Sequence, residues 1–383
     1  NDFQRKTYIL VKNRLVLIPD GLQFMVPTRL LPMATTPLFS LGAKLHIASE
    51  WFRRPSNNHD GPEDQDESVA SFVRRHFGQE MVDRVAEPML SGVFGGDAER
   101  LSVQAVLSRF VTMEREHGSL VRASLKRRKA SSRTAPAPLF TSLRGGVQQL
   151  VDALLACLPR EPLRVGNAAT ALQRSANGWQ VKTPNTSETY DAVLLGVPAP
   201  IAAGLLSTID TEIAGSLGKI QYTSSVAVAL AYAKAGLPPG FGFLVPRSEG
   251  RKLMACTFVH NKFSGRAPAG ATLLRCFFSS SRVPGLLDYS DDQLEVFARQ
   301  ELKEILGLEA DPQFSRVFRW ELGLPQYETG HLERAAEIEA RLAKAPGLQL
   351  IGNSLYGVGI PDCIKSARLA VEKIAPSRDL NTA

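Results

Sequence analysis

The sequence predicts a protein of mixed α/β and α+β class, with two separate sheets and a helical region. Three observations support this. Near the C-terminus, residues 348–365 contain an apolar run, a glycine-rich turn and the start of a helix, and residues 191–198 form a second buried-strand pattern. Residues 30–123 repeat apolar side chains at helical spacing. Between residues 223 and 278, short alternating runs predict the strands of another sheet.

Composition and length are those of a large globular protein. The 383 residues are 44% hydrophobic and 22% charged, and such a chain can bury more than one core. There is no run of eighteen apolar residues and no signal-peptide pattern, so we expect no membrane-spanning helix. The four cysteines form no C-x-x-C pair and the six histidines are scattered. We therefore expect a reducing, cytoplasmic setting and no metal site.

The formal net charge of +7 is a mild surplus, densest at Lys126-Arg127-Arg128-Lys129. A solvated surface loop is the favoured interpretation of this run. No aromatic residues are interleaved with it, so nucleic acid is not an expected partner. An anionic substrate, or peripheral contact with an anionic membrane surface, stays open.

The N-terminal part predicts a hairpin followed by helices. Residues 8–11 and 15–18 flank a turn at Asn13. Ser68 is a candidate N-cap for a helix whose apolar face ends at Phe77.

Two later segments of the helical region invite a functional interpretation. Residues 90–97 are too rich in glycine for a helix interior, and a corner between helices is the simplest expectation. Glu114 to His117 carry charges in a helical stretch, where a solvated face is favoured over a catalytic cluster.

The middle of the chain alternates between helix and strand patterns. A Gly145-Gly146 pair leads into a helix with Leu150, Leu154 and Leu158 on one side. Strands are expected at 163–172 and 178–183. An amphipathic helix is expected at 291–308, and His331 begins another helix, where capping or packing is favoured over acid–base chemistry.

The glycine turn near the end offers the most specific chemistry. Gly352, Gly357 and Gly359 interrupt the strand pattern, and Pro361 suits the first helical position. Backbone N–H groups and the positive end of the helix dipole then meet at one point, which suits a phosphate or the electron-rich face of a cofactor ring. An ordinary strand-to-helix turn explains the shape equally well.

The spelling of this turn, Gly352-Asn353-Ser354-Leu355-Tyr356-Gly357-Val358-Gly359-Ile360-Pro361-Asp362-Cys363-Ile364, closely resembles the C-terminal flavin-binding signature of the protoporphyrinogen oxidase family. These are FAD enzymes within the amine-oxidase-like group. The similarity extends along nearly the whole chain, including Gln326-Tyr327 and Gly330-His331.

The resemblance implies an FAD-binding Rossmann-like domain at 136–205 and 346–383. It implies a mixed-sheet substrate domain at 1–30 and 206–345, and a helical insertion at 31–135 that faces the substrate or a membrane. We find no G-x-G-x-x-G turn, so the first βαβ unit of the family's pattern is missing from this sequence. We expect the chain as given to bind FAD poorly and an upstream unit of this kind to restore binding. Residues 192–197 and 348–351 are expected in one sheet.

The resemblance also assigns site residues. Its cofactor contacts correspond to Gly145, Gly146, Ala169, Asn353, Val358, Gly359 and Ile360, with Ala169 where the family usually has valine beside adenine. Its substrate contacts correspond to Gly92, Leu244, Thr257 and Phe277, although ordinary core packing explains the three strand residues without a ligand. Plant and animal members carry an arginine that pairs with a propionate where this chain has Thr7. The substrate is therefore open between protoporphyrinogen IX and coproporphyrinogen III.

The chemistry that the resemblance implies is flavin dehydrogenation. A hydride leaves a methylene bridge of the porphyrinogen, a pyrrole N–H proton is lost, and three rounds give the porphyrin. Molecular oxygen reoxidises the flavin to give hydrogen peroxide, and no catalytic residue is expected. Another amine-oxidase-like flavoenzyme, such as a carotenoid desaturase, is an alternative that the Gln326-Tyr327 motif and the Gly92 segment disfavour. A porphyrin-binding protein without redox activity is a second alternative, and a homodimer stays open.

Overall fold

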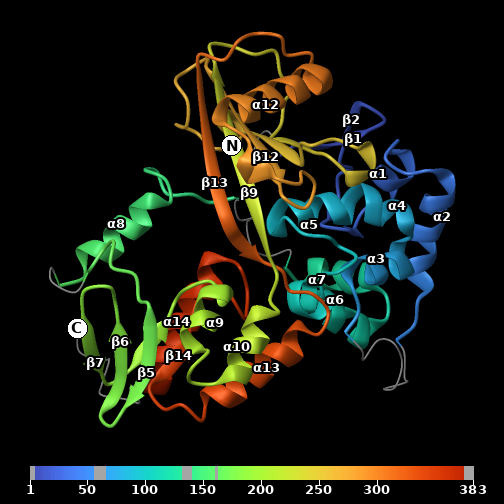
Figure 1. Cartoon of the computed structure of the whole chain (residues 1–383). Coiled ribbons are helices and arrows are strands. Elements are labelled where there is room, and N and C mark those ends of the chain that lie inside the picture. The colour runs from blue at the N-terminus through green and yellow to red at the C-terminus, as the bar shows by residue number, and fades with distance from the viewer. Residues whose placement is uncertain (1–4, 56–65, 132–139, 160–162, 375–383) are drawn as a thin grey trace. The chain divides into compact units, whose positions relative to one another are not determined.

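The computed structural model describes residues 5–55, 66–131, 140–159 and 163–374 (Figure 1). The chain divides into two compact units, each built from two separate stretches of sequence. Unit 1 comprises Asn1–Arg144 and Thr223–Gly323, and unit 2 comprises Gly145–Tyr222 and Leu324–Ala383.

These boundaries differ from the expected domain boundaries at 136, 206 and 346. Residues 206–222 and 324–345 belong to unit 2. The physical reason is packing, because Leu217 and Ile338 share one buried cluster with Leu348.

Unit 1 contains a mixed seven-stranded sheet in the order β13-β9-β12-β11-β10-β1-β2. Its strands are β1 Thr7–Val11, β2 Arg14–Leu17, β9 Tyr222–Tyr232, β10 Gly242–Leu244, β11 Ala255–Phe258, β12 Thr272–Ser279 and β13 Phe314–Pro325. Strand β1 is parallel to β10 and antiparallel to β2. The expected hairpin is confirmed, because Val11 pairs with Arg14 and both turn residues, Lys12 and Asn13, have positive φ, as a two-residue hairpin turn requires.

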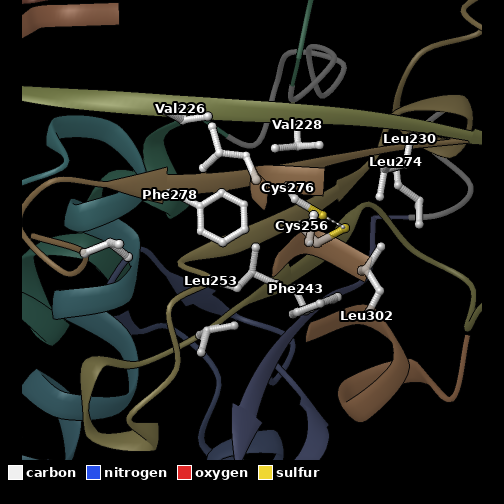
Figure 2. Packing of buried hydrophobic residues seen from close by; sticks show 14 of the residues in the cluster. Val226, Val228, Leu230, Phe243, Leu253, Cys256, Leu274, Cys276, Phe278 and Leu302 are labelled. Atoms are coloured by element: carbon white, nitrogen blue, oxygen red, sulfur yellow. Dashed lines mark hydrogen bonds between the residues drawn. The ribbon is translucent and has the colours of Figure 1, made fainter. Parts of the chain in front are cut away.

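One face of this sheet carries the main core of unit 1. Side chains alternate between the two faces of a strand, so Val228, Cys256 and Cys276 lie on one face together (Figure 2). The helix α12 (Asp291–Leu306) covers them with Leu294, Ala298 and Leu302, all fully buried. A capping box between Ser290 and Gln293 begins this helix, and Gly307 ends it in the left-handed conformation.

Short elements connect the strands of unit 1. They are the strand pair β3 Leu22–Gln23 and β4 Val26–Pro27, the 3-10 turns η4 Arg247–Glu249 and η5 Leu286–Asp288, and the helix α11 Val259–Lys262.

The helical region of unit 1 lies between β4 and residue 131. Its elements are α1 Leu30–Thr35, α2 Leu41–Ser49, η2 Glu50–Phe52, α3 Val69–Phe77, α4 Gln79–Met81, the π-helical turn η3 Val82–Ala86, α5 Glu87–Phe94, α6 Val103–His117 and α7 Leu120–Ser131. The predicted cap is confirmed, since the Ser68 side chain accepts a hydrogen bond from the Ser71 N–H and Val69, Phe72, Val73 and Phe77 are buried.

Three expectations for this region are wrong. Residues 90–94 continue helix α5 through Gly92, and the chain turns only at Gly95, where φ is +64°. The solvated face expected for residues 114–117 is wrong for Glu114, which is buried and bonded to Arg75 and His76, although Arg115 and Glu116 are exposed. Residues 126–129 belong to helix α7 rather than to a loop.

Unit 2 combines two small sheets with five helices among its described residues. The strands β5 Ala171–Ser175, β6 Gly178–Lys182 and β7 Ser187–Tyr190 form an antiparallel sheet, and β8 Val193–Leu195 pairs in parallel with β14 Leu348–Leu350. The helices are α8 Gln148–Ala156, α9 Ala199–Leu206, α10 Thr211–Gly218, α13 His331–Leu342 and α14 Ile360–Ile374.

The pairing of β8 with β14 confirms the expectation that residues 192–197 and 348–351 share a sheet. Trp179 anchors the core beneath them, and its indole N–H donates to the Pro346 carbonyl at 3.0 Å. The expected strand at 163–172 is wrong before Ala171, because Leu163 and Val165 are 57% and 85% exposed and lie outside any ladder. Apolar spacing alone suggested a strand there.

Within the described residues, no helix is long and apolar enough to cross a membrane. The same part of the chain holds no group of three or more His, Cys, Asp or Glu side chains placed to bind a metal ion.

Candidate functional site

The four residues expected to contact the substrate all lie in unit 1, on or beside the sheet face opposite the α12 core. Leu244, Ala255 and Phe277 are cross-strand neighbours on β10, β11 and β12. Thr257 lies in the next row, between Gly242 and Arg275. Strand alternation therefore places Leu244, Thr257 and Phe277 on one face, where each is half-buried.

Gly92 approaches the same face from helix α5. A Cβ atom added to Gly92 would lie 3.8 Å from Cδ2 of Leu244. The structure thus places Gly92 next to Leu244. Leu244 and Phe277 lie in one cross-strand row of the sheet. A half-buried aliphatic side chain, an aromatic ring and a bare helix backbone can together contact a flat apolar molecule.

A cluster of cations lies at the end of this face. Arg275 pairs in register with Thr257, and it interacts electrostatically with Lys262 of α11 and with Arg266. Loss of solvation by the surrounding protein, and then the neighbouring positive charge, lower the pKa of both the half-buried Lys262 and the exposed Arg275. The sequence reasoning missed these residues. The signal was present, because Arg275 is two residues from Phe277 and alternation places both on one face.

Thr7 lies in the same row of the sheet. It pairs with Gly242, which pairs in turn with Thr257, and Thr257 pairs with Arg275. The row therefore runs from a neutral hydroxyl on β1 to a guanidinium on β12.

The candidate cofactor turn lies in unit 2, between β14 and α14. Gly352 and Gly357 have φ of +98° and +75°, a conformation that side chains other than glycine rarely adopt. A Cβ atom on Gly357 would lie 2.4 Å from Cγ of Asp362, so the Asp362 side chain closes back over the turn. The N–H groups of Asp362 and Cys363 are both bonded to the Gly359 carbonyl.

Several side chains fix this turn from behind. The Tyr327 hydroxyl donates to the Asn353 carbonyl at 2.6 Å, and His331 Nε2 lies 2.8 Å from the Leu355 carbonyl oxygen. The rings of Tyr327 and His331 stack with centroids 4.1 Å apart. Both residues are buried, which agrees with the packing role expected for His331. The Gln326-Tyr327 and Gly330-His331 motifs therefore act as supports for the glycine turn.

The exposed side of the turn is mainly backbone. Val358 and Gly359 are half-buried, Ile360 is 49% exposed, and a Cβ atom on Gly352 would meet nothing within 4 Å. The Asp362 carboxylate would repel a phosphate at this helix start. The turn therefore fits the edge of a cofactor ring better than it fits a phosphate.

The other expected cofactor residues lie elsewhere in unit 2. The Gly145 N–H donates to Gln149 Oε1 at 3.2 Å, and Gly146 has φ of +93°, so the pair forms the entry to α8. Ala169 is exposed in the loop before β5. Two residues before it, the buried Oδ1 of Asn167 has no hydrogen-bond partner among the described residues. No sequence pattern predicts this unsatisfied acceptor, which a bound ligand's N–H could satisfy.

A glycine turn at a helix start in one unit, together with an open face of a mixed sheet in the other, is typical of oxidoreductases that hold a cofactor and a substrate in separate domains. The chain belongs to the flavin containing amine oxidoreductase family, whose sequence pattern matches residues 3–375.

Known relatives agree with this assignment. The coproporphyrinogen III oxidase of Bacillus subtilis (strain 168) is 31% identical over 380 residues, covering 97% of this chain and 79% of that protein. The chloroplast protoporphyrinogen oxidase 1 of Spinacia oleracea is 30% identical over 373 residues, covering 89% and 65%. A crystal structure from Exiguobacterium sp. 255-15, described as that of a candidate protoporphyrinogen oxidase, has a TM-score of 0.85 at 30% identity, covering 97% and 80%. The predicted family and fold class are confirmed.

Proposed function

We propose that this chain is an FAD-dependent porphyrinogen oxidase of haem biosynthesis, with molecular oxygen as the electron acceptor. The observation that carries the proposal is the substrate face of unit 1, where Gly92 meets Leu244 and Phe277 lies in the same row, in a chain of the flavin-containing family. A porphyrinogen has apolar rings and carboxylate side chains, and this face offers both apolar contacts and adjacent cations.

FAD would be held by unit 2. We assign Val358, Gly359, Ile360 and Asn353 to the ring end, where backbone polar groups are available, and Gly145, Gly146 and Ala169 to the remainder of the molecule. When bound, FAD supplies the acceptor for the hydride of the porphyrinogen. The N–H groups of Val358, Gly359 and Ile360, just before and at the start of α14, would stabilise negative charge near the ring.

The substrate would be held by Leu244, Phe277 and Thr257, with Gly92 leaving the backbone of α5 bare. These contacts position a ring and exclude water from one of its faces. None of the four can exchange a proton at neutral pH, so we assign no catalytic acid or base to them.

We propose a cytoplasmic protein that also contacts a membrane surface peripherally. Helices α1 and α2 expose Leu30, Leu31, Leu41 and Leu45 by 69–80%, and Phe52 of η2 is 79% exposed. Beside them lies an apolar groove of about 220 Å³ lined by residues such as Met33, Ile47 and Trp51. An exposed apolar patch of this kind marks an interaction surface, and the nearby Arg29, Lys44 and Arg54 suit anionic lipid.

The membrane contact is tested by cosedimentation with vesicles of mixed zwitterionic and anionic lipid. Leu41→Ser with Leu45→Ser should abolish binding. The alternative occupant is a second copy of the chain. In that case neither protein cosediments with the vesicles, and sedimentation without lipid shows a dimer for the unsubstituted chain and a monomer for the double variant.

The redox function is tested without oxygen. Coproporphyrinogen III or protoporphyrinogen IX is mixed with the FAD-loaded protein, and flavin absorbance and porphyrin fluorescence are followed. We expect bleaching of the flavin and formation of porphyrin together. Bleaching by a carotenoid precursor but by neither porphyrinogen would contradict the proposal. Porphyrin binding with no bleaching by any substrate would identify a binding protein without redox activity.

A further inference from the structure

We infer that the outer edge of strand β13 pairs with the same strand of a second copy of this chain, so that two seven-stranded sheets join into one. The two copies are held antiparallel about a two-fold axis at Phe318. The inference goes beyond the proposed function and does not depend on it, because it concerns an edge of the sheet in unit 1 and no ligand.

Strand β13 is long and lies at an edge of its sheet. It has 12 residues, and among the described residues β9 is its only strand neighbour (Figure 1). The strand at the opposite edge, β2, has 4 residues. Edge strands are usually kept short or covered, because their unpaired N–H and C=O groups can pair with another chain. The length of β13 therefore makes this edge a candidate for pairing.

Backbone hydrogen bonds show which residues of β13 point outward. The Gln313 N–H donates to the Ala231 carbonyl at 2.8 Å. The Leu322 N–H donates to Ser224 Oγ at 3.0 Å, so the end of β13 lies beside the start of β9 and the two strands run antiparallel. Successive residues of a strand direct their N–H and C=O groups to opposite edges. Because Gln313 points toward β9, the even-numbered residues of 314–320 point away from it.

The even-numbered positions also carry an exposed row of large side chains. The odd-numbered side chains face α12, since Ser315 Oγ donates to Glu295 and Arg319 forms an ion pair with Asp291. The row on the other face consists of Phe314, Arg316, Phe318, Trp320 and Leu322. Its four hydrophobic members are 39–54% exposed. We name these five residues the β13 row. Exposed rings gathered in this way mark an interaction surface.

The rings of the β13 row are already ordered by contacts within it. The Phe318 and Trp320 rings stack with centroids 6.1 Å apart, and the Arg316 guanidinium lies 5.3 Å from the centroid of the Phe318 ring. Side chains held in place before association lose less conformational entropy when a partner binds. The row is thus preorganised for contact with another row of rings and cations.

The extent of the row sets the register of the pair. Leu322 has φ of +45°, which ends the extended backbone, so the straight edge runs from Phe314 to Leu322 with Phe318 at its midpoint. Antiparallel pairing centred on Phe318 uses this whole edge, whereas any other register leaves an end unpaired. It places Arg316 of each copy opposite Trp320 of the other, where a cation–π contact can form. It also places the two Phe318 rings opposite each other.

One alternative is an edge that its arginines merely protect. Charged side chains discourage edge pairing, and β13 carries two arginines. However, Arg319 is paired with Asp291 and donates to the Tyr289 carbonyl at 2.7 Å, while Arg316 lies over the Phe318 ring. Protection also does not explain the exposed rings on either side of Arg316. Pairing with a second copy explains both the rings and the cation between them.

Sedimentation equilibrium of the full chain over a concentration series tests the pairing. We expect a monomer–dimer equilibrium, and Phe318→Pro should raise the Kd of the dimer about tenfold or more, because proline removes the N–H that would donate across the two-fold axis. That N–H points away from β9, so the sheet should stay intact, which thermal unfolding checks.

Leu17→Pro is the matched control at the opposite edge of the same sheet. The Ile18 N–H donates to the Thr7 carbonyl, so the N–H of Leu17 points away from β1, as that of Phe318 points away from β9. We expect Leu17→Pro to dimerise as the unsubstituted chain does.

Cross-linking tests the register and gives the answer if Phe318→Pro does not fold. In a Cys157→Ser, Cys363→Ser background, Phe318→Cys should form an intermolecular disulfide in air, because Cα atoms of an opposed hydrogen-bonded pair are about 5.5 Å apart. Arg316→Cys alone should not, since its two copies lie roughly 14 Å apart along the strands. A mixture of Arg316→Cys with Trp320→Cys should cross-link one variant to the other.

Three results overturn the inference. The first is a monomer at every concentration, and the second is equal dimerisation of Phe318→Pro and Leu17→Pro. The third is cross-linking of Arg316→Cys with itself but not of Phe318→Cys. If the chain is monomeric and Phe318→Ala raises the KM for porphyrinogen, the β13 row contacts the substrate instead.

The pairing is separable from the other proposals. The Leu41→Ser, Leu45→Ser variant should remain dimeric, and its dissociation would assign the dimer to the apolar patch of α1 and α2 and overturn the inference. Reduction of the flavin by porphyrinogen is measured independently of the oligomeric state, so the oxidase assignment can fail while the dimer stands, and the reverse.

Discussion

The Sγ atoms of Cys256 and Cys276 lie 4.0 Å apart on neighbouring strands in the core of unit 1 (Figure 2). Backbone hydrogen bonds run from Val245 N–H to the Met254 carbonyl and from Phe258 N–H to the Phe241 carbonyl. The backbone polar groups of the even-numbered residues of β11 therefore point toward β10, not toward β12. Cys256 and Cys276 are therefore opposed in a non-hydrogen-bonded pair, where Cα atoms are about 4.5 Å apart. A disulfide can span that separation.

We predict that this pair forms a disulfide when the protein is oxidised with hydrogen peroxide, which is reduced to water as both thiols lose their hydrogens. Burial raises the pKa of the Cys256 thiol, so the reaction should be slow in the native state and faster in mild urea. Intact-mass and non-reducing peptide analysis in a Cys157→Ser, Cys363→Ser background would detect it. Adding Cys276→Ser is the control, and sulfinic acid without any disulfide would contradict the prediction.

Phe277 and Phe278 are adjacent on β12 but face opposite sides of the sheet. Phe277→Ala should raise the KM for porphyrinogen, with a loss of roughly 1–3 kcal/mol of contact, and should affect the melting temperature little. Phe278 is fully buried, so Phe278→Ala should cost about 3–5 kcal/mol of stability. Comparing KM and melting temperature for the two variants distinguishes substrate contact from core packing. An unchanged KM with a lower melting temperature for Phe277→Ala would remove Phe277 from the site.

Gly92→Ala separates packing from function at helix α5. The added Cβ would make an ordinary contact at 3.8 Å with Leu244, and alanine favours a helix over glycine by roughly 0.5–1 kcal/mol. The variant should fold at least as well as the unsubstituted chain and turn over porphyrinogen more slowly, because the methyl group occupies the space that the substrate needs. Full activity together with raised stability would show that the substrate does not contact α5.

Acid should destabilise the helical region through Glu114. Burial by itself would raise the pKa of this carboxyl, but bonds and charges from Arg75 and His76 outweigh it and lower the pKa to about 2. A folded-state pKa below the ordinary 4.5 adds stability that is present above pH 4.5 and is lost as pH falls toward about 2. Urea unfolding followed by tryptophan fluorescence should show this loss.

Glu114→Gln tests the same network. It should lower stability at neutral pH by about 1.5–3 kcal/mol, because it weakens the bonds to Arg75 and His76 while Arg75 keeps its ion pair with Glu67. The variant should also show a shallower fall in stability between pH 4.5 and 2. An acid profile identical to that of the unsubstituted chain would mean that other carboxylates control the transition.

Tyr327 should act on FAD binding as a positioning residue. Tyr327→Phe removes the hydrogen bond that holds the Asn353 carbonyl, and the glycine turn should then bind FAD several-fold more weakly. Tyr356→Phe is a matched control, because its hydroxyl lies in the same turn but bonds to Glu339 instead. Flavin fluorescence during titration with FAD measures both. Equal affinities for the two variants would show that the turn does not depend on Tyr327.

Local patterns predicted those parts of the fold that depend on neighbouring residues in sequence. Strand alternation and glycine spacing gave the hairpin, the sheet strands and the turn before α14, and the Ser68 cap followed from three adjacent positions. Strand alternation would also have placed Arg275 on the same face of the sheet as Phe277.

The predictions that were wrong concern features that depend on contacts between residues distant in sequence. The burial of Glu114 requires Arg75 and His76 from another helix, and no local pattern shows that partnership. Helix α5 continues through Gly92 because flanking residues such as Leu90 and Phe94 are buried, which outweighs the low helix propensity of glycine. The assignment of individual residues to the cofactor and the substrate came from resemblance, and it stays a prediction until the variants above are measured.

The pairing of β8 with β14 has a consequence for how the chain is made. All of β9 to β13 lies between these partners in sequence, and β1 likewise pairs with β10 after the whole helical region. During synthesis from the N-terminus, β8 leaves the ribosome long before its partner exists, with an unpaired strand edge. Neither unit can complete its sheet from a nascent N-terminal portion, and folding of unit 2 must wait for the last strand to be translated. Shortened chains that end before Leu348 are therefore expected to aggregate rather than accumulate as a folded intermediate.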